Sequence, residues 1–180
     1  MPRYVALLRG INVGGNTKVN MAELRSWVTA LGYTDVSTYI NTGNVVFTVD
    51  DEPSALGTDA ALAAELEEQI ERESGLRIPV LVRSRDEIAD AIAANPFPDA
   101  DPSKLIMAFM RDEPDAATLD QWASVDSGDD EIAATGSVVY LHCPGGLGRS
   151  KLGERLLGRR GPLGTTRNLR TVRRLLELAG

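Results

Sequence analysis

The feature of this sequence that most limits its fold is the order in which strand-like and helix-like segments follow one another. Short runs rich in apolar and β-branched residues predict strands in the first half, at residues 4–8, 36–40, 45–49 and 78–82. Apolar side chains spaced three or four residues apart predict helices that end before Gly32, Gly75 and Asn95. The resulting order is strand, helix, strand, strand, helix, strand, helix. This order is typical of the split βαβ, or ferredoxin-like, arrangement.

The same order is predicted for the second half of the chain. Strands are expected at residues 105–110, 132–134, 138–142 and 161–166, and helices at 114–125, 151–157 and 169–176. Between the halves, residues 96–103 read PFPDADPS, and a segment so rich in Pro and Asp is typical of a domain boundary. We therefore predict an α+β protein with two tandem ferredoxin-like halves, residues 1–97 and 104–180. A single continuous α+β domain is the alternative.

Composition indicates where such a protein works. Hydrophobic residues make up 43% of the chain and charged residues 25%, which is ordinary for a soluble globular protein. No apolar run approaches the roughly 20 residues that a membrane span needs, and no secretory signal is evident, so we expect no membrane partner. The single cysteine, Cys143, cannot form a disulfide within the chain. A cytoplasmic location is therefore predicted.

Charge is distributed unevenly along the chain, whose net charge is −7. Residues 141–180 carry nine Lys and Arg against two Glu, whereas the first 140 residues carry ten basic and twenty-four acidic residues. A basic tail on an acidic body is typical of contact with nucleic acid, with a phosphorylated ligand, or with the acidic remainder of the same chain. The sequence leaves these three readings open.

Residues 9–20, RGINVGGNTKVN, have the clearest functional chemistry, because they link the first strand to the first helix. Asn20 and Glu23 predict a capped helix start. Glycines allow backbone N–H groups to turn inward, and a helix N-terminus carries partial positive charge, so the segment predicts an anion site. The candidate ligand-binding residues of this loop are Arg9, Asn12, Gly14, Gly15 and Lys18.

The predicted topology brings other segments to the same sheet edges. Turn 41–44 should lie beside loop 9–20, which adds Asn41 and Asn44 to the candidates. In the second half, GGLGRSK at 145–151 should share an edge with the end of the last strand. The candidates there are Arg149, Ser150, Lys151, Arg167 and Asn168. If the halves bring both edges together, the cations would surround one pocket; alternatively, the glycines only serve turns and the cations pair with Asp50, Asp51 or Glu52.

Catalytic candidates are few. His142 is the only histidine, and its neighbour Cys143 should point to the opposite face of the strand, so the two do not form a dyad. We expect an inert buried thiol and a structural or solvent-facing histidine. One His and one Cys cannot supply a usual structural zinc site, so no metal and no cofactor are predicted.

Four separated motifs resemble those of a bacterial family, domain of unknown function 1697: RGINVGGNTKVNMAELR, YINTGNVVF, GLGRSKL and TTRNLRTVRRL. The resemblance runs nearly end to end and implies two ferredoxin-like halves in a cytoplasmic protein. It implies no established activity, so it assigns no catalytic residue. The chain departs from the family pattern at Leu169, where an aromatic residue is expected.

Three functions agree with these features. We favour binding of a phosphorylated or otherwise anionic small molecule at the glycine-rich loops. The first alternative is binding of a nucleic-acid backbone through the basic C-terminal region. The second is an enzyme that acts on a phosphate ester or activated carbonyl, which requires a carboxylate or a hydroxyl (Ser150, Thr42 or Thr166) close to the bound anion. The free edges of the sheets would also permit a homo-oligomer.

Overall fold

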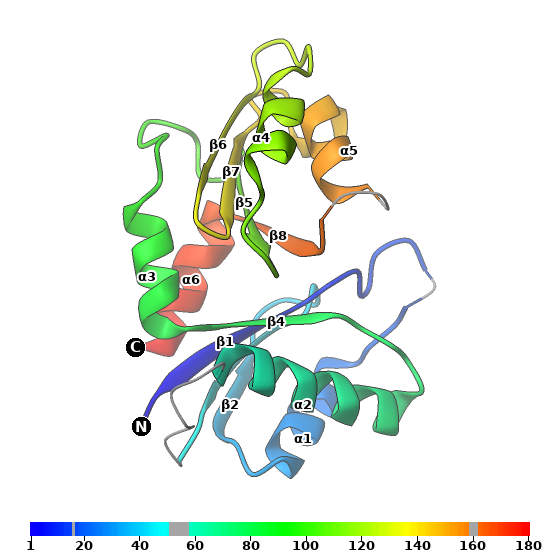
Figure 1. Cartoon of the computed structure of the whole chain (residues 1–180). Coiled ribbons are helices and arrows are strands. Elements are labelled where there is room, and N and C mark those ends of the chain that lie inside the picture. The colour runs from blue at the N-terminus through cyan, green and yellow to red at the C-terminus, as the bar shows by residue number, and fades with distance from the viewer. Residues whose placement is uncertain (16, 51–57, 159–161) are drawn as a thin grey trace. The chain divides into compact units, whose positions relative to one another are not determined.

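The computed structural model describes residues 1–15, 17–50, 58–158 and 162–180. Within these ranges the chain forms eight β-strands and six α-helices, a mixed α+β fold with two four-stranded antiparallel sheets (Figure 1). It divides into two compact units, one of Met1–Ala89 with Leu175–Gly180 and one of Asp90–Arg174. None of the helices in the described ranges has the length and apolar character needed to cross a membrane.

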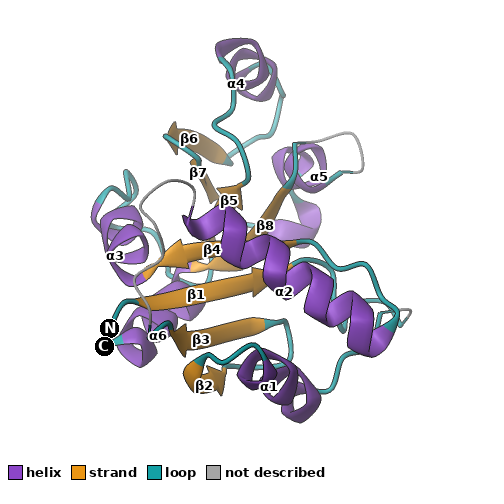
Figure 2. Ribbon diagram, turned by 60° about the horizontal axis from the view of Figure 1, so that its bottom comes forward, coloured by secondary structure: helices purple, strands orange, loops and turns teal. Residues whose placement is uncertain are grey.

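The first unit contains one sheet with the strand order β2-β3-β1-β4. Its elements are β1 (Arg3–Leu8), α1 (Met21–Ala30), β2 (Thr34–Thr38), β3 (Asn44–Thr48), α2 (Thr58–Ser74), β4 (Val80–Ser84) and the start of α3 (Arg85–Ala93). Figure 2 shows α1 and α2 on the same face of this sheet. The C-terminal residues of α6 also belong to this unit, although their position in the sequence predicts the second half. The Nε of Arg85 holds them, since it donates to the carbonyl oxygen of Gly180 at 2.7 Å.

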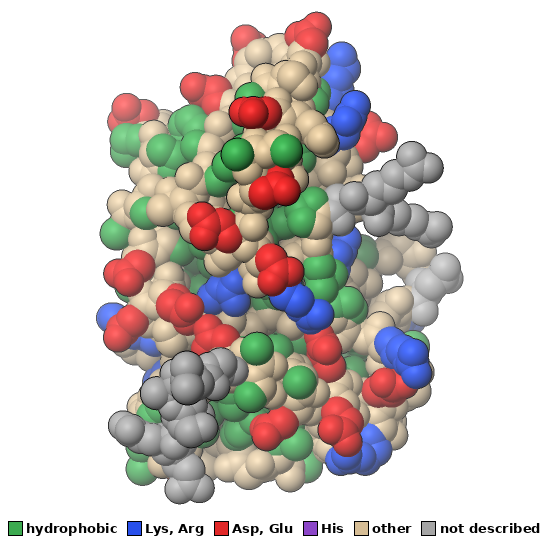
Figure 3. Space-filling model, in the orientation of Figure 1, with side chains coloured by type: hydrophobic (Ala, Val, Ile, Leu, Met, Phe, Trp, Pro, Cys, Tyr) green, Lys and Arg blue, Asp and Glu red, His purple; other side chains and the backbone are tan. Residues whose placement is uncertain are grey.

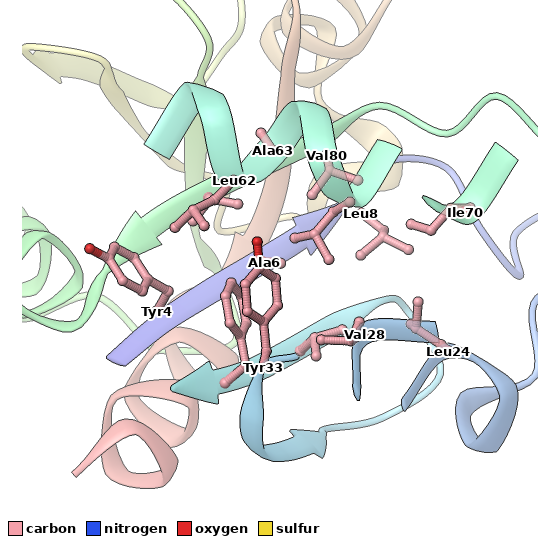
Figure 4. Packing of buried hydrophobic residues seen from close by; sticks show 14 of the residues in the cluster. Tyr4, Ala6, Leu8, Leu24, Val28, Tyr33, Leu62, Ala63, Ile70 and Val80 are labelled. Atoms are coloured by element: carbon pink, nitrogen blue, oxygen red, sulfur yellow. The ribbon is translucent and has the colours of Figure 1, made fainter. Parts of the chain in front are cut away.

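The core of the first unit lies between the sheet and these two helices. Alternate residues of β1 point toward the helices, because successive side chains of a strand face opposite sides. These residues are Tyr4, Ala6 and Leu8, and they pack with Leu24 and Val28 of α1 and with Leu62 and Ile70 of α2 (Figure 4). Aromatic rings add to this core: those of Tyr33 and Phe47 stack with their centroids 4.8 Å apart.

The second unit contains a sheet with the order β6-β7-β5-β8. Its elements are β5 (Leu105–Met110), α4 (Ala116–Ala123), β6 (Glu131–Thr135), β7 (Val138–His142), a short 3-10 turn (Leu147–Arg149), α5 (Lys151–Leu157), β8 (Gly164–Asn168) and most of α6 (Leu169–Ala179). One face of β5 packs against α4 and α5 through Ile106, Ala108 and Met110 on the strand and Trp122, Leu152 and Leu156 on the helices.

Side-chain hydrogen bonds cap two helix starts, that of α1 at Asn20 as predicted and that of α3 at Ser84. The side chain of Asn20 accepts hydrogen bonds from the N–H groups of Ala22 and Glu23, at 2.8 and 3.3 Å, and so caps α1. A reciprocal capping box opens α3: the backbone N–H of Ser84 donates to Glu87 at 2.7 Å, and that of Glu87 donates to the Ser84 hydroxyl at 3.2 Å.

Other boundaries differ from the sequence expectation. Strand β2 ends at Thr38 rather than at residue 40, because the backbone of Ile40 turns to a φ of 49° and leaves the extended conformation. Strand β4 begins at Val80 rather than at residue 78, after Pro79, which has no N–H to donate to a neighbouring strand. Helix α4 is shorter than the expected 114–125, because Asp115 caps it by accepting from the N–H of Thr118 at 2.7 Å.

Gly43 is the glycine whose replacement tests this packing most directly. Its φ is +86°, and an added Cβ would lie 2.7 Å from the Cβ of Leu8 and 2.8 Å from Cδ1 of Ile11. We expect Gly43→Ala to lower the free energy of unfolding by about 2–5 kcal/mol, from backbone strain together with overpacking. Gly32→Ala is the control, because Gly32 has a φ of +90° and open space around it. Denaturant unfolding should show a loss of only about 1–2 kcal/mol for this variant; equal losses for both would contradict the close packing.

Candidate anion-binding loops

The side chain of Asn12 organises loop 9–20. Its Nδ2 donates to the carbonyl oxygen of Val19 at 3.0 Å and to that of Asn41 at 2.6 Å, and its Oδ1 accepts from the N–H of Val19 at 3.1 Å. One amide thus closes the loop on itself and ties it to the turn between β2 and β3. The N–H of Leu8 also donates to the carbonyl oxygen of Gly43, at 2.8 Å. Loop 9–20 and turn 41–44 therefore lie together at one edge of the sheet, as the topology predicts.

The tip of this loop presents backbone N–H groups to solvent. Asn12, Gly14 and Gly15 have φ values of 55°, 69° and 95°, in the left-handed region that Gly and Asn adopt most readily. The N–H of Asn12 donates to the carbonyl oxygen of Thr17. Within the described ranges, those of Val13, Gly14 and Gly15 donate to no carbonyl, and all three residues are exposed. Turns of this kind, with neighbouring free N–H groups, form concave sites for anions.

Two cations flank the tip. Arg9 is half-buried and Lys18 is exposed, and neither side chain makes a hydrogen bond or ion pair with any residue that the structure describes. Asp50, one of the carboxylates considered as their partner, instead accepts from the hydroxyl of Thr34 at 3.1 Å. The other two, Asp51 and Glu52, lie outside the described residues. The described part of the chain thus leaves both charges available to a ligand.

Two predicted binding residues of the first unit are engaged within the chain. The buried Asn44 donates from Nδ2 to the carbonyl oxygen of Tyr39 at 2.9 Å and to the hydroxyl of Thr42 at 3.0 Å. Asn12 uses both amide hydrogens as described above. The N-terminus of α1 is also occupied, because Asn20 already accepts from its first free N–H groups. Free N–H groups for an anion therefore come from the loop tip rather than from the helix end.

In the second unit, the glycine-rich loop borders a hollow of about 480 Å³. Its lining residues are Leu147, Gly148, Arg149, Ser150, Lys151, Gly153, Glu154 and Leu157. The exposed side chains of Arg149 and Lys151 have no hydrogen-bond or ion-pair partner among the described residues. Ser150 is buried and caps α5, since its hydroxyl accepts from the N–H of Gly153 at 2.9 Å.

Arg167 does not form an exposed wall of this hollow, contrary to the expectation from its place near the end of the last strand. It is only 9% exposed, and its guanidinium donates to the Thr165 hydroxyl at 2.9 Å and to the Thr166 carbonyl oxygen at 2.7 Å. Burial lowers the pKa of Arg167 to about 10. Asn168 is also engaged, because its Oδ1 accepts from the N–H of Thr171 at 2.9 Å at the start of α6.

Groups that could perform catalysis are held in structural roles. Cys143 is fully buried, and burial raises the pKa of its thiol, so little of the reactive thiolate forms. Nδ1 of His142 lies 3.1 Å from a carboxylate oxygen of Glu131, and its ring lies 5.9 Å from that of Phe97. Among the residues that the structure describes, no three His, Cys, Asp or Glu side chains gather as a metal site.

Sequence reasoning missed one titratable pair, Asp59 at the start of α2 and Glu87 in the capping box of α3. Burial, followed by the hydrogen bond and charge of Glu87, raises the pKa of Asp59 to about 7, against the opposing charge of Arg83. Burial alone would raise the pKa of Glu87, but its hydrogen bonds with Asp59 and Ser84 hold that pKa below the usual range. No spacing in the sequence links Asp59 to Glu87, so only the fold reveals this pair.

The pair predicts a pH dependence of stability. The folded chain keeps the proton on Asp59 up to pH near 7, whereas an unfolded chain releases it near pH 4, so rising pH favours unfolding across this window. We expect the melting temperature of Asp59→Asn to fall less than that of the wild type between pH 4.5 and pH 7.5, by a few degrees. The Asn side chain keeps a hydrogen-bond donor but does not titrate. Glu73→Gln, at an exposed site of the same helix, is the control, and identical pH profiles for Asp59→Asn and wild type would contradict the proton-sharing pair.

Comparison with known proteins places the chain in a family without assigning an activity. The model of the family described as "Protein of unknown function (DUF1697)" matches residues 1–140. The structure of conserved bacterial protein SP0830 from Streptococcus pneumoniae is similar, with 25% sequence identity, a TM-score of 0.78 and coverage of 99% of each chain. No curated protein matches this sequence. On the family match, the chain belongs to the DUF1697 family of proteins of unknown function.

Proposed function

We propose that this protein binds a phosphorylated or otherwise anionic small molecule at the tip of loop 9–20. The observation that carries the proposal is the set of groups around this tip that have no partner in the described chain. These are the side chains of Arg9 and Lys18 and the N–H groups of Val13, Gly14 and Gly15. Asn12 and Asn44 hold the loop and turn in place, and Asn41 joins them through its carbonyl oxygen.

The binding free energy that such a site can supply is enough to hold a small anionic molecule. A charge-assisted hydrogen bond from a cation contributes about 1.5–3 kcal/mol, and two cations with several N–H donors approach the roughly 8 kcal/mol of micromolar binding. Without a ligand, water solvates these exposed groups, so the loop needs no internal partner for them. In the second unit, the hollow beside Arg149 and Lys151 offers another contact for an anion. Ser150, Arg167 and Asn168 would support that contact by shaping the backbone rather than by touching the ligand.

We also propose that each unit is a ferredoxin-like, split βαβ domain of a cytoplasmic protein. The element order β-α-β-β-α-β and the antiparallel strand orders β2-β3-β1-β4 and β6-β7-β5-β8 support this assignment. We propose residues 1–97 and 104–180 as the boundaries of these two domains.

Nucleic-acid backbone binding is the second candidate, and one feature favours it. Arg170 and Arg173 lie on the exposed side of α6, three residues apart and thus on neighbouring turns. Acidic side chains are spread over the surface seen in Figure 3, and they would repel phosphates. An enzyme gains less support, because the hydroxyls of Ser150 and Thr42 already accept hydrogen bonds within the chain.

The proposal is tested by a thermal-shift screen of inorganic pyrophosphate, sugar phosphates and nucleoside phosphates with the whole chain. A ligand at 100 times its Kd should add about 2.7 kcal/mol to stability, which corresponds to roughly 5–10 °C for a chain of this size. We expect Arg9→Gln and Lys18→Gln each to weaken binding about tenfold or more. Arg77→Gln is the matched control, because Arg77 is an exposed cation of the same unit that pairs with Glu71 at 2.7 Å.

Two results would overturn the assignment. One is a screen in which no anion raises the melting temperature. The other is a ligand whose affinity is equal in wild type, Arg9→Gln and Lys18→Gln. Binding of short oligonucleotides with a steep salt dependence that Arg170→Gln with Arg173→Gln abolishes would favour the nucleic-acid alternative instead.

A further inference from the structure

Turn 41–44 begins beside an unusual residue, Ile40. Its φ is 49°, and its side chain is 47% exposed. A β-branched residue in this left-handed region is a genuine outlier, because its Cβ crowds the backbone. Asn or Gly would adopt the same conformation more easily, and an exposed Ile gains little from the core. Strain of this kind is often kept where a side chain is needed for contact with something outside the chain.

A second apolar side chain is exposed at the same edge. Val13, at the tip of loop 9–20, is 60% exposed. It follows Asn12, and Ile40 precedes Asn41. The hydrogen bond of 2.6 Å from Nδ2 of Asn12 to the carbonyl oxygen of Asn41 therefore holds the two apolar residues on adjoining segments. Among the described residues, the only other large hydrophobic side chains with comparable exposure are Met1 and Leu157.

We propose that Val13 and Ile40 contact a flat apolar part of the same ligand whose anionic group binds at loop 9–20, so that the ligand class is a nucleoside phosphate or a close chemical equivalent. This inference rests on the proposed function. An inorganic anion would use the cations and N–H groups but would have no use for the exposed aliphatic side chains of Val13 and Ile40. A ring system attached to a phosphate uses both, because its face covers apolar surface while its charge meets Arg9 and Lys18.

The size of the apolar contact argues for a small ligand. A stable protein interface takes about 20–30 residues from each side, whereas this edge offers two large apolar side chains from two short segments.

The test compares two probes, a nucleoside monophosphate and inorganic phosphate, by isothermal titration with the full chain. In Ile40→Asn, we expect the affinity for the nucleoside monophosphate to fall about tenfold and the affinity for inorganic phosphate to stay unchanged. The unliganded variant should keep its melting temperature or gain a few degrees, because Asn accepts a positive φ. Val13→Ser should show the same loss of affinity without that gain. Ala61→Ser is the control, because Ala61 is an exposed apolar residue of α2 in the same unit.

The outcomes separate this inference from the proposed function. If inorganic phosphate binds and depends on Arg9, but the nucleoside monophosphate binds no more tightly or ignores Ile40→Asn and Val13→Ser, the inference fails and the proposed function stands. If neither probe binds, the inference fails. If, in addition, no anion of the thermal-shift screen raises the melting temperature, the proposed function fails as well. Self-association or binding to anionic vesicles that is lost in Ile40→Asn, with nucleotide affinity unchanged, would assign the apolar residues to another partner and overturn the inference.

Discussion

The first unit's candidate site depends on the hydrogen bonds of one side-chain amide, that of Asn12. This residue sits at a positive φ, which Asn tolerates better than most side chains, and it bonds Val19 on its own loop and Asn41 on the neighbouring turn. These side-chain hydrogen bonds stand in for the strand-to-strand backbone hydrogen bonds, which end where β1 ends. They hold the loop in a defined shape. The N–H groups of the following glycines stay exposed.

The sheet determines where this loop can act. Strand β1 lies between β3 and β4, and β3 runs antiparallel to it, so the end of β1 and the turn before β3 meet at one edge. Gly43 brings that turn close to Leu8 and Ile11, which are buried. The packed apolar core thus lies directly against turn 41–44 and loop 9–20, which carry the polar groups and the cations. This arrangement resembles many ligand sites, in which a packed scaffold positions loops that carry the chemistry.

Much of this fold could be predicted from residues close together in the sequence. The features that could not be predicted depend on contacts between distant segments. The order of the elements, the caps Asn20 and Ser84 with Glu87, and the contact between loop 9–20 and turn 41–44 all follow from nearby residues or from simple topology. Neither the burial of Arg167 nor the pairing of Asp59 with Glu87 has a local signal, because each depends on segments distant in the sequence. The left-handed Ile40 contradicts its own β preference, so no propensity could have predicted it.

NMR tests most directly whether the free N–H groups at the loop tip bind an anion. Inorganic pyrophosphate should be titrated into the ¹⁵N-labelled chain while the backbone amide signals are followed. We predict saturable shifts that are largest at Val13, Gly14 and Gly15 and that need about tenfold more pyrophosphate, or more, to saturate in Arg9→Gln. Unchanged signals at these three residues, with shifts confined to the exposed arginines of α6, would contradict the account.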